Sequence, residues 1–161
     1  MKKIVLLMCL SGLFASFYSV AEKRSVGPVE YIKVTELENF KFLTRVDTGA
    51  NTTSIHAFDI KVNNDAGKMK DNVGKTVTFT TMNEKKEFRT HQAEIVDVVT
   101  IRNAIAKEQR YQVELSLSWR GESKKVLVNL SDRKKMSYKL LIGRNWLKGD
   151  YVVDVEVQPE E

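Results

Sequence analysis

The segment from Tyr111 to Trp119 alternates apolar and polar residues without a break, and this pattern restricts the fold more than any other feature of the sequence. A period of two places every second side chain on the same face of a β-strand. The residues from Arg120 to Glu122 predict a turn, and residues 125–130 then return with a second alternating pattern. The two patterns together predict a β-hairpin with one buried face.

The same period of two recurs along most of the chain. Further strands are expected over residues 29–37, 40–46, 73–81, 88–101 and 151–157. The polar stretch 63–72 predicts an exposed loop, and one short helical turn is expected near residues 144–147, ending at Gly149. These patterns predict an all-β chain with little helix.

Residues 1–21 have the organisation of an export signal. Two lysines precede an apolar run over residues 4–14, and small residues at 19–21 come just before a predicted cleavage point ahead of Glu22. An uncleaved membrane anchor is the alternative, but the apolar run is short for a membrane span and serine and glycine interrupt it. We therefore expect a signal peptide over residues 1–21, and a periplasmic or secreted chain with no stable membrane insertion after cleavage.

The remaining residues 22–161 are expected to form a single domain, and their composition excludes several kinds of chemistry. The 26 Lys and Arg residues exceed the 21 Asp and Glu residues by only five, which does not predict a nucleic-acid partner. The one cysteine, Cys9, lies in the predicted signal, so neither a disulfide framework nor a cysteine nucleophile is expected. His56 and His91 lack the spacing of a zinc-binding helix, and no glycine-rich phosphate loop is found. We predict no metal and no cofactor.

Two short segments could carry chemistry. The residues Asp47 to Ala50 follow a predicted strand, where a carboxylate followed by glycine can be presented to a ligand from a tight loop. The alternative is a turn in which Asp47 only bonds its own backbone. About 95 residues later, the apolar residues before Gly143 lead into Arg144 and the predicted helical turn.

In these segments the chain resembles the retropepsin-like aspartic proteases, whose single-domain subunits carry one such loop, a flap hairpin, and an apolar segment with Gly-Arg before a short helix. The resemblance extends over about residues 29–157 and is greatest for a bacterial branch that carries the label "ATP-dependent zinc protease". The pattern of that branch is found here as Asp47 to Ala50, Ser54 with His56, Asp132 with Arg133, and Leu141 to Arg144.

The resemblance implies a retropepsin-like closed β-barrel subunit with a flap hairpin and one short helix near the C-terminus. The flap would have arms near residues 96–102 and 109–117 and a tip around residues 103–108. Retroviral members commonly carry an aspartate where this chain has Asn51, so a hydrogen bond to Arg144 is expected there instead of an ion pair.

The resemblance also implies roles for individual residues. Asp47 would be the catalytic carboxylate. Thr48 would tie two loops together across a dimer axis, Gly49 would let the substrate backbone approach, and Ala50 would complete the loop. A further set is expected to contact substrate or support the site, namely Asn51, Thr52, Ser54, His56, Ile142, Gly143 and Arg144.

An aspartic protease needs two carboxylates that share one proton, and this chain supplies one suitable loop. We therefore expect a homodimer in which Asp47 and its symmetry mate activate a water molecule. The predicted function is an exported aspartic endopeptidase that acts on a peptide or protein substrate without zinc or ATP. The first alternative is a non-catalytic peptide-binding or scaffold module of the cell envelope that keeps the protease fold. The second is an envelope protein that acts with a ligase or transporter partner.

Overall fold

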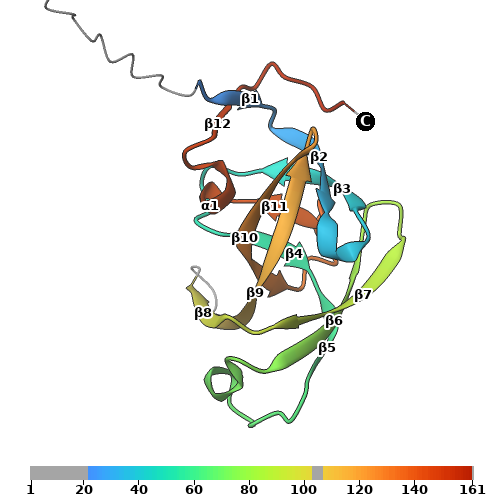
Figure 1. Cartoon of the computed structure of the whole chain (residues 1–161), viewed down its shortest axis with the longest axis vertical. Coiled ribbons are helices and arrows are strands. Elements are labelled where there is room, and N and C mark those ends of the chain that lie inside the picture. The colour runs from blue at the N-terminus through green and yellow to red at the C-terminus, as the bar shows by residue number, and fades with distance from the viewer. Residues whose placement is uncertain (1–21, 103–106, 161) are drawn as a thin grey trace, which may run out of the picture.

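The computed structural model describes residues 22–102 and 107–160, which form a β-rich molecule with three short helical turns (Figure 1). In chain order the strands are β1 (Arg24–Val26), β2 (Val29–Val34), β3 (Phe40–Val46), β4 (Thr53–His56), β5 (Phe58–Val62), β6 (Thr76–Met82), β7 (Phe88–Glu94), β8 (Asp97–Arg102), β9 (Lys107–Trp119), β10 (Glu122–Ser131), β11 (Leu140–Ile142) and β12 (Tyr151–Val153). The helical turns are η1 (Thr35–Leu37), η2 (Met69–Asn72) and α1 (Arg144–Leu147). The predicted all-β class is confirmed.

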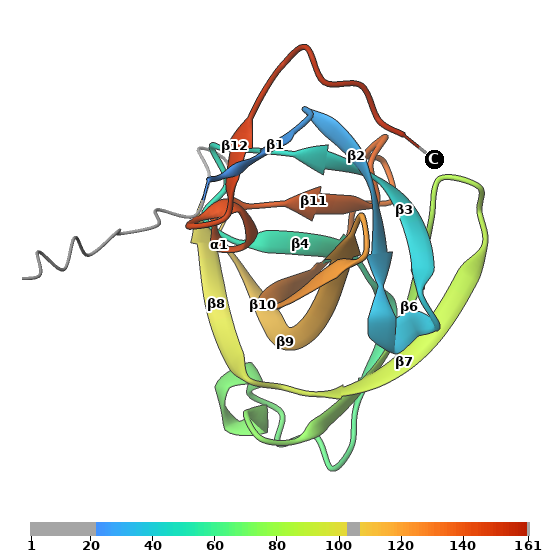
Figure 2. The same ribbon diagram turned by 45° about the horizontal axis from the view of Figure 1, so that its top comes forward.

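The main sheet contains seven strands in the order β10-β4-β11-β3-β2-β9-β8, and β9 also pairs with β10. Because β9 pairs with β10, the first strand in this order, the strands from β10 to β9 form a ring. They curve around a common centre (Figure 2). The closure is narrow, because β2 and β9 share only the register pairs Lys33↔Ser118 and Val34↔Leu117. The expected barrel is therefore only partly closed, since most of β9 pairs with β8 or β10.

The alternating segment that restricts the fold behaves as predicted. In β9 the residues Val113, Leu115 and Leu117 have no exposed surface, and they belong to the apolar core between the strands. Arg120 and Gly121 both have positive φ, 47° and 86°, which is the backbone of a two-residue hairpin turn. Because this turn is so tight, the return strand β10 begins three residues earlier than its alternating pattern indicated.

Strands β5, β6 and β7 form a separate antiparallel sheet, which we call the extension (residues 58–94). It lies at one end of the molecule (Figure 1). The strand expected over residues 88–101 is interrupted between β7 and β8, where Ile95 is buried. The interruption arises because the chain changes partner strand here: the N–H of Ile95 still donates to the carbonyl of Lys75 beside β6 at 2.9 Å, whereas the N–H of Val96 donates to the carbonyl of Gln112 on β9 at 2.8 Å.

Three other sequence predictions need correction. Residues 35–37 form η1 instead of extending β2, and η2 lies within the loop expected over residues 63–72. The last strand ends at Val153, because the backbone then turns and the N–H of Val157 donates to the carbonyl of Asp154 at 3.3 Å. The short helix occurs as predicted, followed by Gly149 at φ 97°.

The hairpin of β8 and β9 lies where the flap was expected. Its pairing runs from Asp97↔Gln112 to Arg102↔Lys107, and the rest of the expected tip, residues 103–106, lies outside the described residues. The predicted signal at residues 1–21 also lies outside them. None of the helices in the described ranges has the length and apolar character needed to cross a membrane.

Candidate active site

Asp47 follows the last residue of β3 and begins a tight loop. Its backbone N–H donates to the carbonyl of Ile142 at 2.9 Å, which extends the pairing of β3 with β11. The N–H of Gly49 donates to Asp47 Oδ1 at 2.8 Å, and the N–H of Ala50 donates to the Asp47 carbonyl at 3.3 Å. The carboxylate thus organises its own loop, as the simple-turn alternative expected. It also remains partly exposed to solvent, as a reactive group must.

The segment that begins at Gly143 holds this loop from the other side. The N–H groups of Arg144 and Asn145 donate to the carbonyls of Ala50 at 2.8 Å and Asn51 at 3.2 Å. The Arg144 guanidinium donates through Nη1 to the carbonyl of Thr48 at 3.1 Å and through Nη2 to Asn51 Oδ1. The hydrogen bond expected between Asn51 and Arg144 is therefore present. Residues almost a hundred positions apart fix the loop that contains Asp47.

Position 143 requires glycine, because the neighbouring backbone leaves no space for a side chain. A Cβ placed on this residue would lie 2.5 Å from the carbonyl carbon of Thr52, closer than side-chain carbons approach backbone. Its N–H donates to Thr53 Oγ1 at 3.1 Å, and the Thr53 hydroxyl donates in turn to Asn145 Oδ1 at 2.9 Å. Only glycine lets the two segments lie this close together.

Asn145 and Thr53 were missed as support residues by the sequence analysis. The Asn145 amide accepts from both the N–H and the hydroxyl of Thr53, each at 2.9 Å, and donates to the carbonyl of Leu127 on β10 at 2.8 Å. The available signal was the position of Asn145 directly after Gly143 and Arg144. Its amide joins β4, β10 and α1 behind the Asp47 loop.

Ser54 and His56 lie on β4, whose four residues are all buried. Within the described structure Ser54 Oγ has no hydrogen-bond partner. His56 is 2% exposed, stacks on Phe58 with ring centroids 5.4 Å apart, and accepts the N–H of Arg133 at Nδ1 at 2.9 Å. Because burial lowers the pKa of His56 and Nδ1 acts as a hydrogen-bond acceptor, the imidazole is neutral near pH 7. Its contacts are those of a structural residue that holds the end of β10.

Arg133 places positive charge near Asp47, and Arg110 lies close to Arg133, although the sequence analysis gave neither of them a role. Arg133 follows β10, and Arg110 belongs to the flap arm β9. Burial and the like charge of Arg110 lower the pKa of Arg133, and the Asp47 carboxylate acts in the opposite direction. Arg133 Nε donates to the carbonyl of Tyr138 at 3.2 Å, which fixes its side chain. Asp47 therefore lies within electrostatic reach of a half-buried cation.

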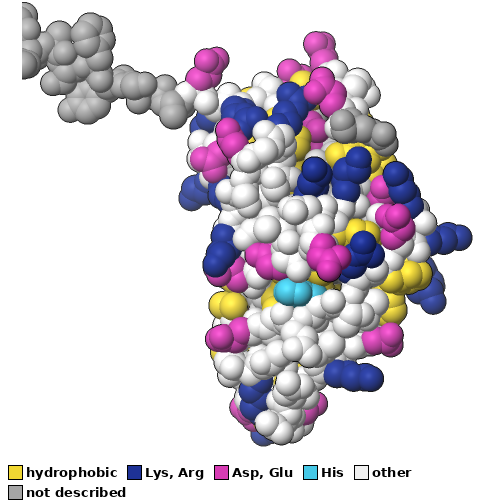
Figure 3. Space-filling view, turned by 45° about the vertical axis from the view of Figure 1, so that its right-hand side comes forward, with side chains coloured by type: hydrophobic (Ala, Val, Ile, Leu, Met, Phe, Trp, Pro, Cys, Tyr) yellow, Lys and Arg dark blue, Asp and Glu magenta, His cyan; other side chains and the backbone are white. Residues whose placement is uncertain are grey.

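No group of three or more His, Cys, Asp or Glu side chains in the described ranges could hold a metal ion. On the face shown in Figure 3, positive and negative side chains are interspersed and form no single-sign surface.

Residues 25–159 match the model of the RimB-like family, described as retropepsin-like aspartic endopeptidase RimB. The chain belongs to this family. The matched range includes both the Asp47 loop and the segment from Gly143. The family description does not contain the zinc protease label that the resemblance suggested.

Relatives and solved structures extend this result. The chain is 26% identical over 141 residues to a probable alpha-L-glutamate ligase of Parasynechococcus marenigrum, and 29% identical over 133 residues to a protein of the same name from Shewanella pealeana. These matches cover 85% and 80% of this chain but only 29% and 28% of the ligases, so the chain spans less than a third of their length. A Legionella pneumophila protein of unknown function has the same fold, with a TM-score of 0.67, 24% identity, and coverage of 85% of this chain and 97% of that one.

Proposed function

We propose that this RimB-like chain is an aspartic endopeptidase that hydrolyses peptide bonds as a homodimer. The supporting observation is the Asp47 loop, in which a partly exposed carboxylate at the end of β3 is held by backbone bonds to residues 142–145. A rigid loop of this kind keeps a reactive group in one position, which catalysis requires.

In the proposed mechanism two Asp47 carboxylates from the two copies share one proton. The ionised carboxylate takes a proton from a water molecule as its oxygen attacks the scissile carbonyl carbon. The protonated carboxyl donates its proton to the carbonyl oxygen, which gives a neutral tetrahedral diol. The carboxyl that took the water's proton then gives it to the nitrogen, the other carboxylate takes a proton from a diol hydroxyl, and the C–N bond breaks to release an amine and a carboxylic acid. The two carboxyls titrate as one unit, so no separate pKa belongs to either.

The proposed dimer places Thr48 and Arg144 at the twofold axis. Both residues are exposed and line an open hollow of about 490 Å³ beside α1 and β12. Arg144 already orders the Thr48 carbonyl within one copy, so the loop is arranged before any partner arrives. The β8–β9 hairpin would cover an extended substrate that lies over the two loops.

We also propose that the site accepts substrates with acidic side chains. Arg133 brings positive charge to the region of Asp47, and this charge would attract carboxylates, whereas Arg110 beside it is already paired with Glu108 at 2.6 Å. The name of the relatives, alpha-L-glutamate ligase, refers to an acidic amino acid and fits this proposal. Cleavage in the periplasm or outside the cell follows from the export signal expected at residues 1–21.

Asp47→Asn tests the proposed mechanism. We expect cleavage of a mixed peptide library, which includes glutamate-rich members, to fall by about 10²- to 10⁴-fold, because the variant cannot supply the general base. Sizing should still show a dimer, and circular dichroism should show an unchanged fold. Asp59→Asn, at an exposed carboxylate of the extension, is the matched control and should retain full activity. Cleavage by Asp47→Asn at the normal rate would overturn the mechanism.

A non-catalytic peptide-binding module is the second candidate, favoured by the relatives in which the matching region is less than a third of a ligase. This candidate predicts a monomer, or a dimer whose Asp47 residues lie far apart. It also predicts peptide binding without cleavage at any pH. Cross-linking through a cysteine introduced at residue 48 separates the two candidates, since only the protease dimer brings these positions together.

A further inference from the structure

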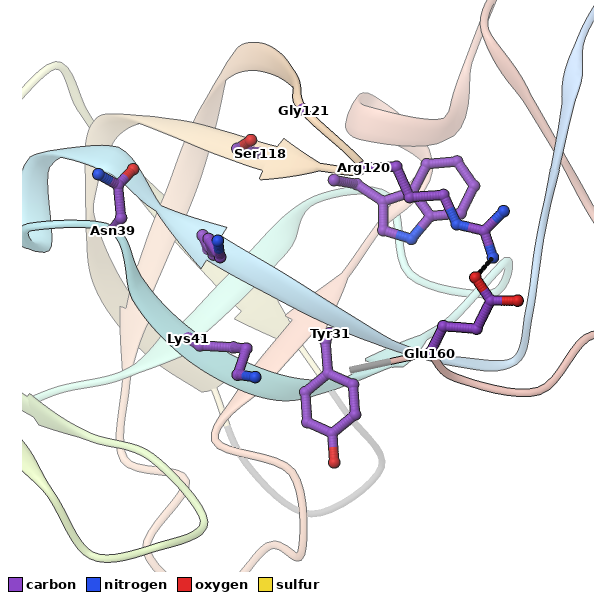
Figure 4. A pocket seen from close by; sticks show the side chains of 9 residues that line it. Tyr31, Asn39, Lys41, Ser118, Arg120, Gly121 and Glu160 are labelled. Atoms are coloured by element: carbon purple, nitrogen blue, oxygen red, sulfur yellow. Dashed lines mark hydrogen bonds and ion pairs between the residues drawn. The ribbon is translucent and has the colours of Figure 1, made fainter.

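A cationic hollow lies on the outer surface of the main sheet, where β2, β3 and β9 meet (Figure 4). Its volume is about 490 Å³, and it forms where β2 and β9 separate beyond their two shared register pairs. Lys41 lies on the wall of the hollow, near the start of β3. Asp47 comes six residues later, just past the end of this strand, a separation of about 20 Å at the usual rise of a strand. The hollow is therefore a different place from the candidate active site.

Its positive charge comes from side chains that the sheet register brings together. Lys33 and Lys41 are direct partners in the β2–β3 register, and like charges in that position destabilise a sheet. The Lys41 ammonium lies 4.9 Å from the centre of the Tyr31 ring, which keeps it over the hollow. With Arg120, three cations line the hollow against one carboxylate, that of Glu160. A bound anion would relieve the repulsion between the two lysines.

The chain's own C-terminal tail supplies that carboxylate. The tail is anchored where the N–H of Asp154 donates to the carbonyl of Val26 at 2.9 Å. It then packs so closely on Gly27 that a Cβ there would lie 2.6 Å from the Val157 carbonyl oxygen. From this point the tail runs across the end of the barrel (Figure 2), and Glu160 Oε2 reaches Arg120 Nη2 at 3.0 Å.

We propose that this hollow is a second binding site, one that takes a peptide segment carrying acidic side chains, and that Glu160 is its internal occupant. Glu160 forms an ion pair with only one of the three cations, Arg120. Lys33 and Lys41 can therefore bind two further carboxylates. The Arg120 and Glu160 side chains are 43% and 77% exposed, and an ion pair this exposed is weak and readily exchanged. An acidic peptide can therefore displace the tail.

The ligand class follows from the occupant. Glu160 is a carboxylate on an extended peptide, and the asparagine and serine on the wall, Asn39 and Ser118, can bond a peptide backbone. The proposal does not depend on catalysis at Asp47, so Asp47→Asn should bind the peptide as the natural chain does. Loss of cleavage and loss of binding at the hollow are thus separate outcomes.

The test uses tryptophan fluorescence of the purified chain, because Trp119 lines the hollow and Arg120 lies 4.8 Å from its ring centre. The probe is a synthetic peptide with the sequence of residues 154–161, and its matched partner has glutamine in place of every glutamate. We expect saturable binding of the acidic peptide alone, which weakens as salt rises. Removal of the internal competitor in Glu160→Gln should tighten binding about two- to fivefold, the range for one exposed ion pair.

The double variant Lys33→Gln with Lys41→Gln should weaken binding about fivefold or more, because two of the three cations are lost. Lys61→Gln, at an exposed lysine of the extension, is the control and should bind normally. Backbone NMR shifts on adding the peptide should be confined to β2, β9 and the tail. Equal binding of the glutamine peptide, equal competition by inorganic phosphate, or unchanged affinity in the double variant would each overturn the proposal.

Discussion

Asn145 in α1 and Asn72 in η2 each use one amide to hold a loop, but they connect different kinds of segment. The partners of Asn145, Thr53 and Leu127, are 92 and 18 residues away and belong to strands β4 and β10 of the main sheet. Most partners of Asn72 lie within seven residues, in the β5–β6 loop. Its one remote partner is the hydroxyl of Tyr111 on the flap arm β9, at 2.9 Å.

The difference indicates how each region is built. The Asp47 loop depends on contacts between segments that meet only when the whole main sheet has formed. The loop of the extension mostly organises itself, and a single hydrogen bond from Asn72 attaches it to the flap arm. Damage at the Asp47 loop should therefore spread through the main sheet, whereas damage to the β5–β6 loop should stay local.

The largest expected effect comes from a pair of glycines. Gly143→Ala should destabilise the fold by about 3 kcal/mol, because its Cβ would meet the Thr52 backbone at 2.5 Å and backbone cannot move aside as a flexible side chain can. Gly74→Ala in the extension should cost about 1–2 kcal/mol, since its φ of 84° disfavours a side chain although nothing lies within 4 Å. Urea unfolding measures both values. Equal costs would mean that space at Gly143 is not what restricts it.

The two asparagines should give the next largest effect. Asn145→Ala should cost about 2–3 kcal/mol of unfolding free energy, because it leaves the Leu127 carbonyl and the Thr53 N–H without their partner. Asn72→Ala should cost about 1–2 kcal/mol, with faster amide exchange confined to residues 63–75 and the neighbouring part of β9.

Hydrogen exchange followed residue by residue distinguishes the two asparagine variants. Tyr111→Phe is the matched control, because it removes only the bond between the loop and the flap arm. Its loop should stay protected, while β9 should exchange faster near residue 111. Global acceleration of exchange in Asn72→Ala would contradict the local role of the extension.

The sequence was sufficient to predict the features set by local patterns. The alternation of β9, the turn at Arg120 and the short helix α1 each depend on periodicity or on a turn residue, and all three occur in the structure. The contact between Asn51 and Arg144 also followed from sequence, through the family resemblance.

The features that were missed depend on contacts between distant segments. Asn72 lies in a polar stretch whose pattern predicts an exposed loop. It is nevertheless buried, because its side-chain amide donates a hydrogen bond to the hydroxyl of Tyr111, 39 residues later. Arg133 was named only with Asp132 in the family pattern and was given no role, and only the fold brings it near Asp47. The strand expected over residues 151–157 ends at Val153, because β1 offers it only three partners, and Val155 beyond it is exposed.

The two histidines extend the comparison to pH and should give the smallest effect. Burial lowers the pKa of both His56 on β4 and His91 on β7 below the ordinary 6.5. Below pH 6.5 the two histidines therefore bind more protons in the unfolded chain than in the folded chain. The stability that each neutral imidazole contributes is complete above pH 6.5 and is lost as the pH falls through the folded pKa.

His56 should dominate this loss, because protonation at Nδ1 would also break its bond from the Arg133 N–H. His56→Gln should cost about 1 kcal/mol at pH 7.5, and this difference from the natural chain should shrink by pH 5.5, where the natural chain loses the same bond. His91→Gln, half-buried on the edge of the extension, should change stability by about 0.5 kcal/mol or less at both pH values. Urea titrations at the two pH values measure both differences. A His56 variant whose cost is the same at pH 5.5 as at pH 7.5 would show that the imidazole stays neutral over this range and that its bond to Arg133 does not couple the fold to pH.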